Sequence, residues 1–235
     1  AFFVLIAIFL LPLWAFSLFF LVAAGFGVFE WAGLASLKSA LTKYLYTGLF
    51  VVLCALLYLQ KEYFTDFITL VVVLWAFAVA SILIYPRSEP LYQNQWFVGL
   101  LGLLIMVGAW VSLCVLRASD QGAWWLFWLF VLTTATDVGA YFVGKAYGKN
   151  HLAKQLSPGK TWEGAIGGGA IATLLCASTL ILWQSYAVGA ALLLTLVLVC
   201  ISVFGDLFES LLKRTSGIKD SGTILPGHGG ALDRI

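Results

Sequence analysis

Charged side chains are scarce in this sequence. Lysine, arginine, aspartate and glutamate make up 10% of the 235 residues, whereas hydrophobic residues make up 62%. A soluble domain usually carries about 25% charged residues, so this chain lacks the polar groups needed to cover a surface that faces water. Lipid must therefore be its main solvent. The net charge of +2 is also too small to indicate nucleic-acid binding.

Cysteine is scarce as well, and the sequence contains no Cys-x-x-Cys pair. The four cysteines all lie inside apolar runs: Cys54, Cys114, Cys176 and Cys200. Isolated cysteines in such runs usually act as small hydrophobic packing residues. We therefore expect neither disulfides nor a cysteine metal site.

Short polar breaks divide the chain into apolar runs of membrane-spanning length. A helix needs about 20 apolar residues to cross the hydrocarbon core. The predicted spans are 13–36, 42–60, 65–85, 96–116, 122–146, 164–184 and 187–213. The shorter run 1–11, before Pro12, is expected to be part of a truncated first helix. We expect one all-α membrane domain over 1–235, with a hydrophobic half (1–120) and a catalytic half (121–235).

The cationic residues indicate how these spans are oriented. If the spans alternate, one side of the membrane holds only Lys61 and Arg117. The other side holds Lys38, Lys43, Arg87, Lys145, Lys149, Lys154, Lys160, Lys213, Arg214, Lys219 and Arg234. The side rich in lysine and arginine is normally cytoplasmic. The two longest polar loops, 145–163 and 213–234, are therefore predicted to face the cytoplasm.

Asp137 is the first functional candidate, because it lies inside the fifth of these spans. A carboxylate at the centre of a membrane helix costs ~2.5–3.5 kcal/mol on insertion scales, so it usually has a function. Asp137, Ala140, Tyr141 and Gly144 share one helix face, whose small bulk suits a ligand or a second helix. The alternative is a structural hydrogen bond between helices, beside a packing seam of Gly144 and Gly148.

The second candidate is the run Ser157-Pro-Gly-Lys-Thr-Trp-Glu-Gly164. A P-loop is excluded, because Lys154 stands where that motif needs a glycine and we expect no β-strand before the run. Ser157, Lys160 and Thr161 are still suited to bind phosphate, since Lys160 supplies a cation and a helix N-terminus follows. A basic loop that only contacts anionic headgroups is the alternative.

The third candidate begins in the last span. Asp206, Glu209, Ser210 and Lys213 are spaced to share one helix face, and a glycine-rich loop follows. The carboxylates of Asp206 and Asp233 are predicted to hold Mg²⁺, and neighbouring cations would neutralise phosphates. The predicted catalytic set is Asp206, Asp233, Lys213, Arg214 and Lys219. Further substrate-binding candidates are Asp220, Gly227, His228, Gly229, Gly230 and Arg234. A structural salt-bridge network is the alternative, although it would not need the glycines.

At these residues the sequence resembles a known family. The stretch Ser210–Ile235 closely resembles the signature of phosphatidate cytidylyltransferases, and 137–148 and 157–164 are similar to the family's upstream elements in the same order. The bacterial members are nearest. The signature continues with an aspartate after the position of Ile235, so we expect the sequence to be truncated there.

The resemblance implies a reaction and its requirements. The expected reaction is CTP plus phosphatidate giving CDP-diacylglycerol and pyrophosphate, at the cytoplasmic face of the inner membrane. Mg²⁺ is the implied cofactor, with ligands at the positions of Asp206 and Asp233, and a second cation is left open. CTP, phosphatidate and the bilayer are the implied partners, and the chain is expected to form a homodimer.

Three other functions compete with this prediction. A CTP-dependent lipid kinase would need similar groups but would release CDP instead of pyrophosphate. A transporter would place polar groups near the middle of the membrane and often shows inverted repeats, and no repeat is visible here. A phosphatidyltransferase would need a carboxylate-rich helix motif that this sequence lacks.

Overall fold

The computed structural model describes residues 2–218, 221–222, 230 and 232. The helices in this part of the chain are α1 (Phe2–Leu10), α2 (Leu13–Leu34), α3 (Ala40–Leu59), the short 3₁₀ helix η1 (Lys61–Tyr63), α4 (Phe64–Leu83), α5 (Glu89–Tyr92), α6 (Gln95–Ala118), α7 (Gly122–Tyr147), α8 (Trp162–Gln184) and α9 (Val188–Thr215). Seven of these segments are long and apolar enough to cross a membrane. The predicted all-α polytopic membrane fold is therefore confirmed.

The ends of the helices follow from local chemistry. Pro12 separates α1 from α2. It has no backbone N–H with which to continue α1, and proline is well tolerated at the start of a helix such as α2. Ser39 caps α3 by accepting a hydrogen bond from the backbone N–H of Thr42. Asn94 caps α6, where its Oδ1 accepts from the N–H groups of Trp96 and Phe97. Such caps satisfy backbone donors that a helix leaves unpaired. Each end of the seven predicted spans lies within two residues of the corresponding end of α2, α3, α4, α6, α7, α8 or α9.

The chain divides into two compact units, and each is described by itself. The first comprises Ala1–Ala123 and Leu212–Ile235, and the second comprises Trp124–Leu211. The expectation of a single domain over 1–235 stays a prediction.

Within the first unit, α6 is the central helix, packed against α2, α3 and α4. Buried indole groups link α2 and α6. Trp31 Nε1 donates to the carbonyl of Val98 at 2.9 Å, and Trp110 Nε1 donates to the carbonyl of Ser17 at 2.9 Å. Close packing also depends on small residues, since a Cβ at Gly108 would lie 2.9 Å from Cγ1 of Val71. These contacts make α6 the most buried of the seven candidate spans.

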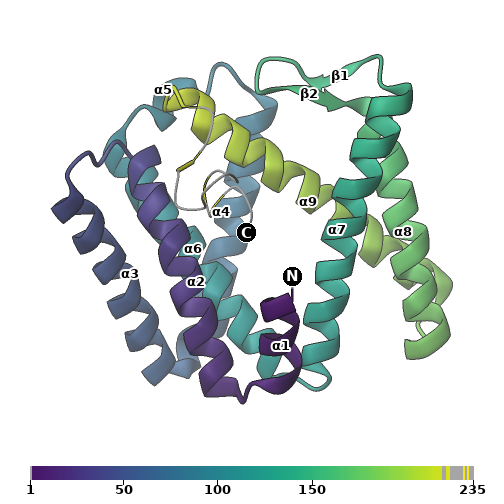
Figure 1. The fold of residues 1–235 in the computed structure, drawn as a ribbon, viewed down its shortest axis with the longest axis horizontal. Coiled ribbons are helices and arrows are strands. Elements are labelled where there is room, and N and C mark those ends of the chain that lie inside the picture. Colours follow the sequence, from purple (N-terminus) through teal and green to yellow (C-terminus); the bar gives the residue numbers. More distant parts are fainter. Residues whose placement is uncertain (1, 219–220, 223–229, 231, 233–235) are drawn as a thin grey trace. The chain divides into compact units, whose positions relative to one another are not determined.

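The second unit contains α7, α8 and α9 up to Leu211 (Figure 1). Its buried core is formed by Trp128, Leu132, Ala172, Cys176, Ala177, Leu180, Ala191 and Val199. Large apolar side chains such as Leu174 and Leu182 are exposed on the outside of the protein. In a membrane protein that position faces lipid, so the exposure carries no penalty. All four cysteines are free thiols, of which Cys54, Cys114 and Cys176 are buried and Cys200 is exposed.

A short β-hairpin joins α7 to α8 (Figure 1). Strand β1 (His151–Ala153) pairs antiparallel with β2 (Ser157–Thr161), with His151 opposite Thr161. The expectation that no strand precedes Ser157 was therefore wrong, because a three-residue strand leaves no recognisable alternation in the sequence. The P-loop remains excluded. Ser157–Thr161 is itself a strand, so its backbone does not form the phosphate-enclosing loop of that motif.

Candidate active site

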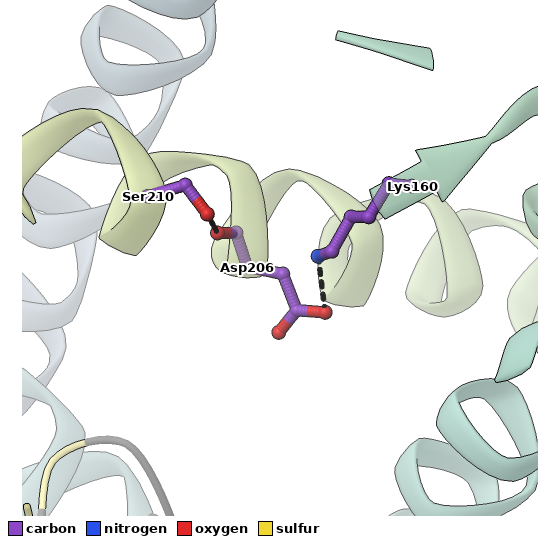
Figure 2. Close-up of polar contacts among 3 residues, drawn as sticks. All are labelled: Lys160, Asp206 and Ser210. Atoms are coloured by element: carbon purple, nitrogen blue, oxygen red, sulfur yellow. Dashed lines mark hydrogen bonds and ion pairs between the residues drawn. The ribbon is translucent and has the colours of Figure 1, made fainter. Parts of the chain in front are cut away.

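The second unit brings together Lys160 and Asp206, which are 46 residues apart in the sequence. Figure 2 shows Lys160 extending from β2 toward Asp206 on α9. Lys160 Nζ lies 2.6 Å from Asp206 Oδ2, and the two side chains are 31% and 45% exposed. A partly exposed pair of this kind contributes only ~0.2–1 kcal/mol to stability. Stability therefore does not explain why two charges are held at the apolar helices of this unit.

The hairpin positions Lys160 through contacts at its base. Glu163 Oε2 accepts hydrogen bonds from the backbone N–H groups of Lys149 and Asn150, at 3.1 and 3.2 Å, and Oε1 accepts from Asn150 Nδ2 at 2.7 Å. Thr161 Oγ1 caps α8 by accepting from the N–H of Gly164 at 3.1 Å. The start of α8 is thereby fixed to the end of α7. Lys160, which directly precedes the cap, is held at this junction.

On α9, Asp206 and Ser210 lie one turn apart (Figure 2). Ser210 Oγ donates to the backbone carbonyl of Asp206 at 2.9 Å. The hydroxyl of Ser210 is therefore engaged with its own helix, whereas the carboxylate of Asp206 extends away from it. The predicted common face of Asp206, Glu209, Ser210 and Lys213 requires one continuous helix, and α9 is continuous over these residues.

Asp137 belongs to the same group of charges. Its carboxylate, on α7, is close enough to interact electrostatically with both Asp206 and Lys160. Lys160 forms its ion pair with Asp206, and the carboxylate of Asp137 lies within the electrostatic reach of that pair.

The seam between α7 and α8 explains how Asp137 comes to this place. A Cβ at Gly168 would lie 2.7 Å from Cα of Ala140, and a Cβ at Gly164 would lie 2.8 Å from the Ala140 carbonyl oxygen. Gly144 and Gly148 lie against Thr161, as the packing alternative for this helix predicted. Asp137 itself makes no hydrogen bond or ion pair with the residues that the structure describes. The seam is therefore built by glycine and alanine, and the carboxylate is not part of it.

The other predicted site residues are distributed differently. Ser157 begins β2 opposite Ala153. Lys213 and Arg214 lie in the last turn of α9, where positive charge complements the helix C-terminus. Gly230 is buried in the first unit. The remaining candidates lie outside the described residues: Lys219, Asp220, Gly227, His228, Gly229, Asp233 and Arg234.

The sequence analysis missed Glu30. This glutamate lies on α2 and is only 4% exposed. Its Oε2 accepts hydrogen bonds from Ser221 and Leu232, in the stretch that carries the family resemblance. The signal was available in the sequence, because Glu30 is the only charged residue between positions 13 and 34. A lone carboxylate within a membrane span is a functional candidate by default.

The donor set fits magnesium. Mg²⁺ usually takes one or two protein carboxylates and completes its octahedron with water and phosphate oxygens. Asp206 and Asp137 supply carboxylate oxygens of that kind in the second unit. Within the described residues no group of three or more histidine, cysteine, aspartate or glutamate side chains could hold a metal. A magnesium ion held by Asp206 and Asp137 would therefore take its remaining ligands from water and phosphate oxygens.

Comparison with known proteins identifies the family. A model described as the cytidylyltransferase family matches residues 1–235. The chain belongs to the cytidylyltransferase family. The match covers the chain from end to end, so it includes Asp137, Lys160 and Asp206.

Curated relatives in this family carry a more specific name. The chain is 40% identical to the phosphatidate cytidylyltransferase of Pseudomonas aeruginosa over 224 residues, covering 94% of this chain and 82% of that protein. It is 35% identical to the phosphatidate cytidylyltransferase of Haemophilus influenzae, covering 99% of this chain and 88% of that protein. A shorter match, 38% identical, covers 67% of this chain and 61% of the Bacillus subtilis protein of the same name.

Proposed function

We propose that this protein transfers the cytidylyl group of CTP to phosphatidate, forming CDP-diacylglycerol and pyrophosphate. The observation that carries the proposal is the pairing of Lys160 with Asp206 beside Asp137, in a chain that belongs throughout to the cytidylyltransferase family. The curated relatives that this chain matches over most of their length are named phosphatidate cytidylyltransferases. The charged groups are those that a reaction between two phosphate-bearing substrates requires.

The reaction needs charge neutralisation more than proton transfer. A phosphate monoester oxygen of phosphatidate attacks the α-phosphorus of CTP, the bond from that phosphorus to the bridging oxygen breaks, and pyrophosphate leaves in line. Because a phosphate monoester loses its second proton near pH ~6, the nucleophile is already anionic at neutral pH. No general base is needed. The main barrier is the repulsion between two polyanions, which fixed cations lower.

The residues have separate roles in this proposal. Lys160 moves from Asp206 to a phosphate oxygen when substrate binds. The phosphate can replace the carboxylate because lysine forms charge-assisted hydrogen bonds with either anion. Asp206 and Asp137 would hold Mg²⁺, which would neutralise phosphate charge and stabilise the leaving group. Asp233 keeps its proposed role as a metal ligand. Lys213, Arg214 and Lys219 are proposed to neutralise the remaining phosphate charge.

The membrane setting fits this assignment of roles. The acyl chains of phosphatidate stay in lipid while CTP arrives from water. We propose the cytoplasmic face of the bacterial inner membrane as the location, because the lysines and arginines gather on one side of the predicted spans. A homodimer is proposed on the family resemblance.

The position of a label distinguishes this function from a CTP-dependent kinase. The purified protein in detergent micelles, given Mg²⁺ and phosphatidate, is expected to move label from the α-phosphorus of CTP into the lipid phase and to release one pyrophosphate per lipid. CTP labelled at the γ-phosphorus is the matched control, and its label should stay in water. Label from the γ-phosphorus in lipid, with CDP released, would instead establish a kinase.

Removal of divalent cations is expected to stop the reaction. Metal ions supply several kcal/mol of charge stabilisation in phosphoryl-type transfers, so chelation with EDTA should lower turnover by at least about 10²-fold. Excess Mg²⁺ should restore it fully. Ca²⁺ prefers more ligands and a less regular shell, so it should restore little. The initial rate of label transfer is measured with EDTA, after addition of Mg²⁺ and after addition of Ca²⁺. Undiminished turnover in EDTA would contradict the metal assignment.

A further inference from the structure

Glu30 is a buried carboxylate that forms no ion pair with the residues that the structure describes. It lies four residues before the end of α2, and only 4% of it is exposed. Burial of an isolated carboxylate is costly unless its oxygens are hydrogen-bonded. The groups that contact Glu30 therefore indicate the role for which this costly buried carboxylate is retained.

Both hydrogen bonds to Glu30 come from the stretch after α9. Leu232 donates its backbone N–H to Oε2 at 2.8 Å, and Ser221 donates its hydroxyl to the same oxygen at 3.2 Å. One carboxylate oxygen thus joins two residues that are 11 positions apart. Oε1 accepts no hydrogen bond from the residues that the structure describes.

Two glycines allow the backbone to approach this carboxylate. A Cβ at Gly222 would lie 2.6 Å from Cδ of Glu30, and a Cβ at Gly230 would lie 2.6 Å from its Oε2. Gly230 also lies against Gly222, since its Cβ would be 2.7 Å from the Gly222 nitrogen. The two ends of the segment 221–232 therefore meet on one side chain. Side chains at either glycine would overlap Glu30.

A neighbouring contact ties the chain just before this segment to α2. Ser216 Oγ donates to the carbonyl of Leu34, one turn after Glu30, at 2.9 Å. The chain leaves α9 through Gly217, whose φ of +71° is the left-handed conformation that ends many helices. The last two turns of α2 thus bind the chain at 216, 221 and 232.

We infer that Glu30 is a positioning residue for the reaction, which holds the two ends of the segment 221–232 together through Ser221 and Leu232. Ser221 directly follows Lys219 and Asp220, and Leu232 directly precedes Asp233 and Arg234. Fixing the chain at these two points, through the side chain of Ser221 and the backbone of Leu232, restricts where the neighbouring charged residues can lie. The inference rests on the proposed function, because it assigns those neighbours to the substrates.

Hydrogen exchange tests the contact without any assay of activity. In the purified full chain, the Leu232 amide is expected to be protected, and Glu30→Ala should speed its exchange by at least about tenfold, because its acceptor is lost. Glu30→Gln keeps an oxygen that can accept both hydrogen bonds, so it should keep most of the protection. Equal exchange in the wild-type protein and Glu30→Ala would overturn the inference, whatever the activities are.

Activity then separates positioning from folding alone. Glu30→Ala is expected to lower kcat/KM by about 10²-fold, mainly through kcat, because misplacement of about 1 Å has effects of that size. Glu30→Gln should recover most of the loss. Glu62→Ala, at an exposed glutamate on η1, is the matched control and should change neither readout. Full activity of Glu30→Ala with an unprotected Leu232 amide would overturn the inference, as would an inactive Glu30→Gln with a protected amide.

A second variant disturbs the same contact and leaves Glu30 in place. Gly230→Ala puts a methyl group onto Ser221 Oγ and Glu30 Oε2, so it should also expose the Leu232 amide and lower kcat. Gly48→Ala, where nothing lies within 4 Å, is its control. If the wild-type protein shows no cytidylyl transfer, the proposed function fails, and the exchange data still decide whether Glu30 holds the segment.

Discussion

Replacing Asp206 with asparagine is expected to lower kcat/KM by about 10²–10³-fold, the scale of losing one preorganised electrostatic contact in an active site. Asparagine has nearly the same shape, so the α9 helix should be retained. The charge that pairs with Lys160 at 2.6 Å and that would hold a metal disappears. Transfer of the α-phosphorus label into lipid measures the loss, with protein recovery from membranes as the check on insertion.

Asp120→Asn is the matched control for this variant. Asp120 is an exposed carboxylate in the break between α6 and α7, and it belongs to none of the candidate elements. It should keep the wild-type rate. Near-normal transfer by Asp206→Asn would contradict both the metal assignment and the role of the ion pair.

Lys160 and Asp206 should also be coupled. Lys160→Met alone leaves Asp206 without its cation, and Asp206→Asn alone leaves Lys160 without its anion. If both groups act on the same phosphate, the double variant should lose less than the sum of the two single losses, because groups that act as one unit are not additive. Fully additive losses would indicate two independent roles.

The spans were predictable because membrane helices are set by length and hydropathy alone. The run from Leu13 to Leu34 has only one charged residue, and its boundaries come from Pro12 on one side and a polar turn on the other. Such signals are local in the sequence. The same holds for the helix face of Asp206 and Ser210, since spacing within one helix fixes which residues share a face.

Contacts between distant residues could not be predicted in this way. The motifs of Lys160 and Asp206 were each recognisable as polar, but no local pattern says that they form a pair across 46 residues. The β-hairpin was missed because its strands are too short to show alternation. The hydrogen bonds from the backbone of Lys149 and Asn150 to Glu163 also join residues that no local pattern pairs. Glu30 was not predicted because it belongs to no motif, although an isolated carboxylate within a membrane span is costly enough to mark it as a candidate.

Gly168→Ala is expected to destabilise the second unit strongly. The added Cβ would overlap the backbone nitrogen of Ala140 and lie 2.7 Å from its Cα and 2.8 Å from the carbonyl carbon of Gly139. These are backbone atoms, so no change of rotamer relieves the overlap and the two helices must separate. Overpacking of this kind costs about 1–3 kcal/mol or more. Thermal unfolding in detergent, followed by tryptophan fluorescence, should show a lower midpoint than wild type.

Alanine at Gly189 should have the opposite effect on the midpoint of thermal unfolding. Nothing lies within 4 Å of a Cβ at this position of α9, and alanine is favoured over glycine within a helix by about 0.5–1 kcal/mol. Gly189→Ala should therefore raise the midpoint slightly and leave label transfer unchanged. Gly168→Ala should lower the midpoint and the transfer rate together, because α7 carries Asp137 and Lys160 lies on β2 directly before α8. If Gly168→Ala were as stable as wild type, α7 and α8 could not be in close contact at Gly139 and Gly168. The position assigned to Asp137, which depends on that contact, would then be wrong.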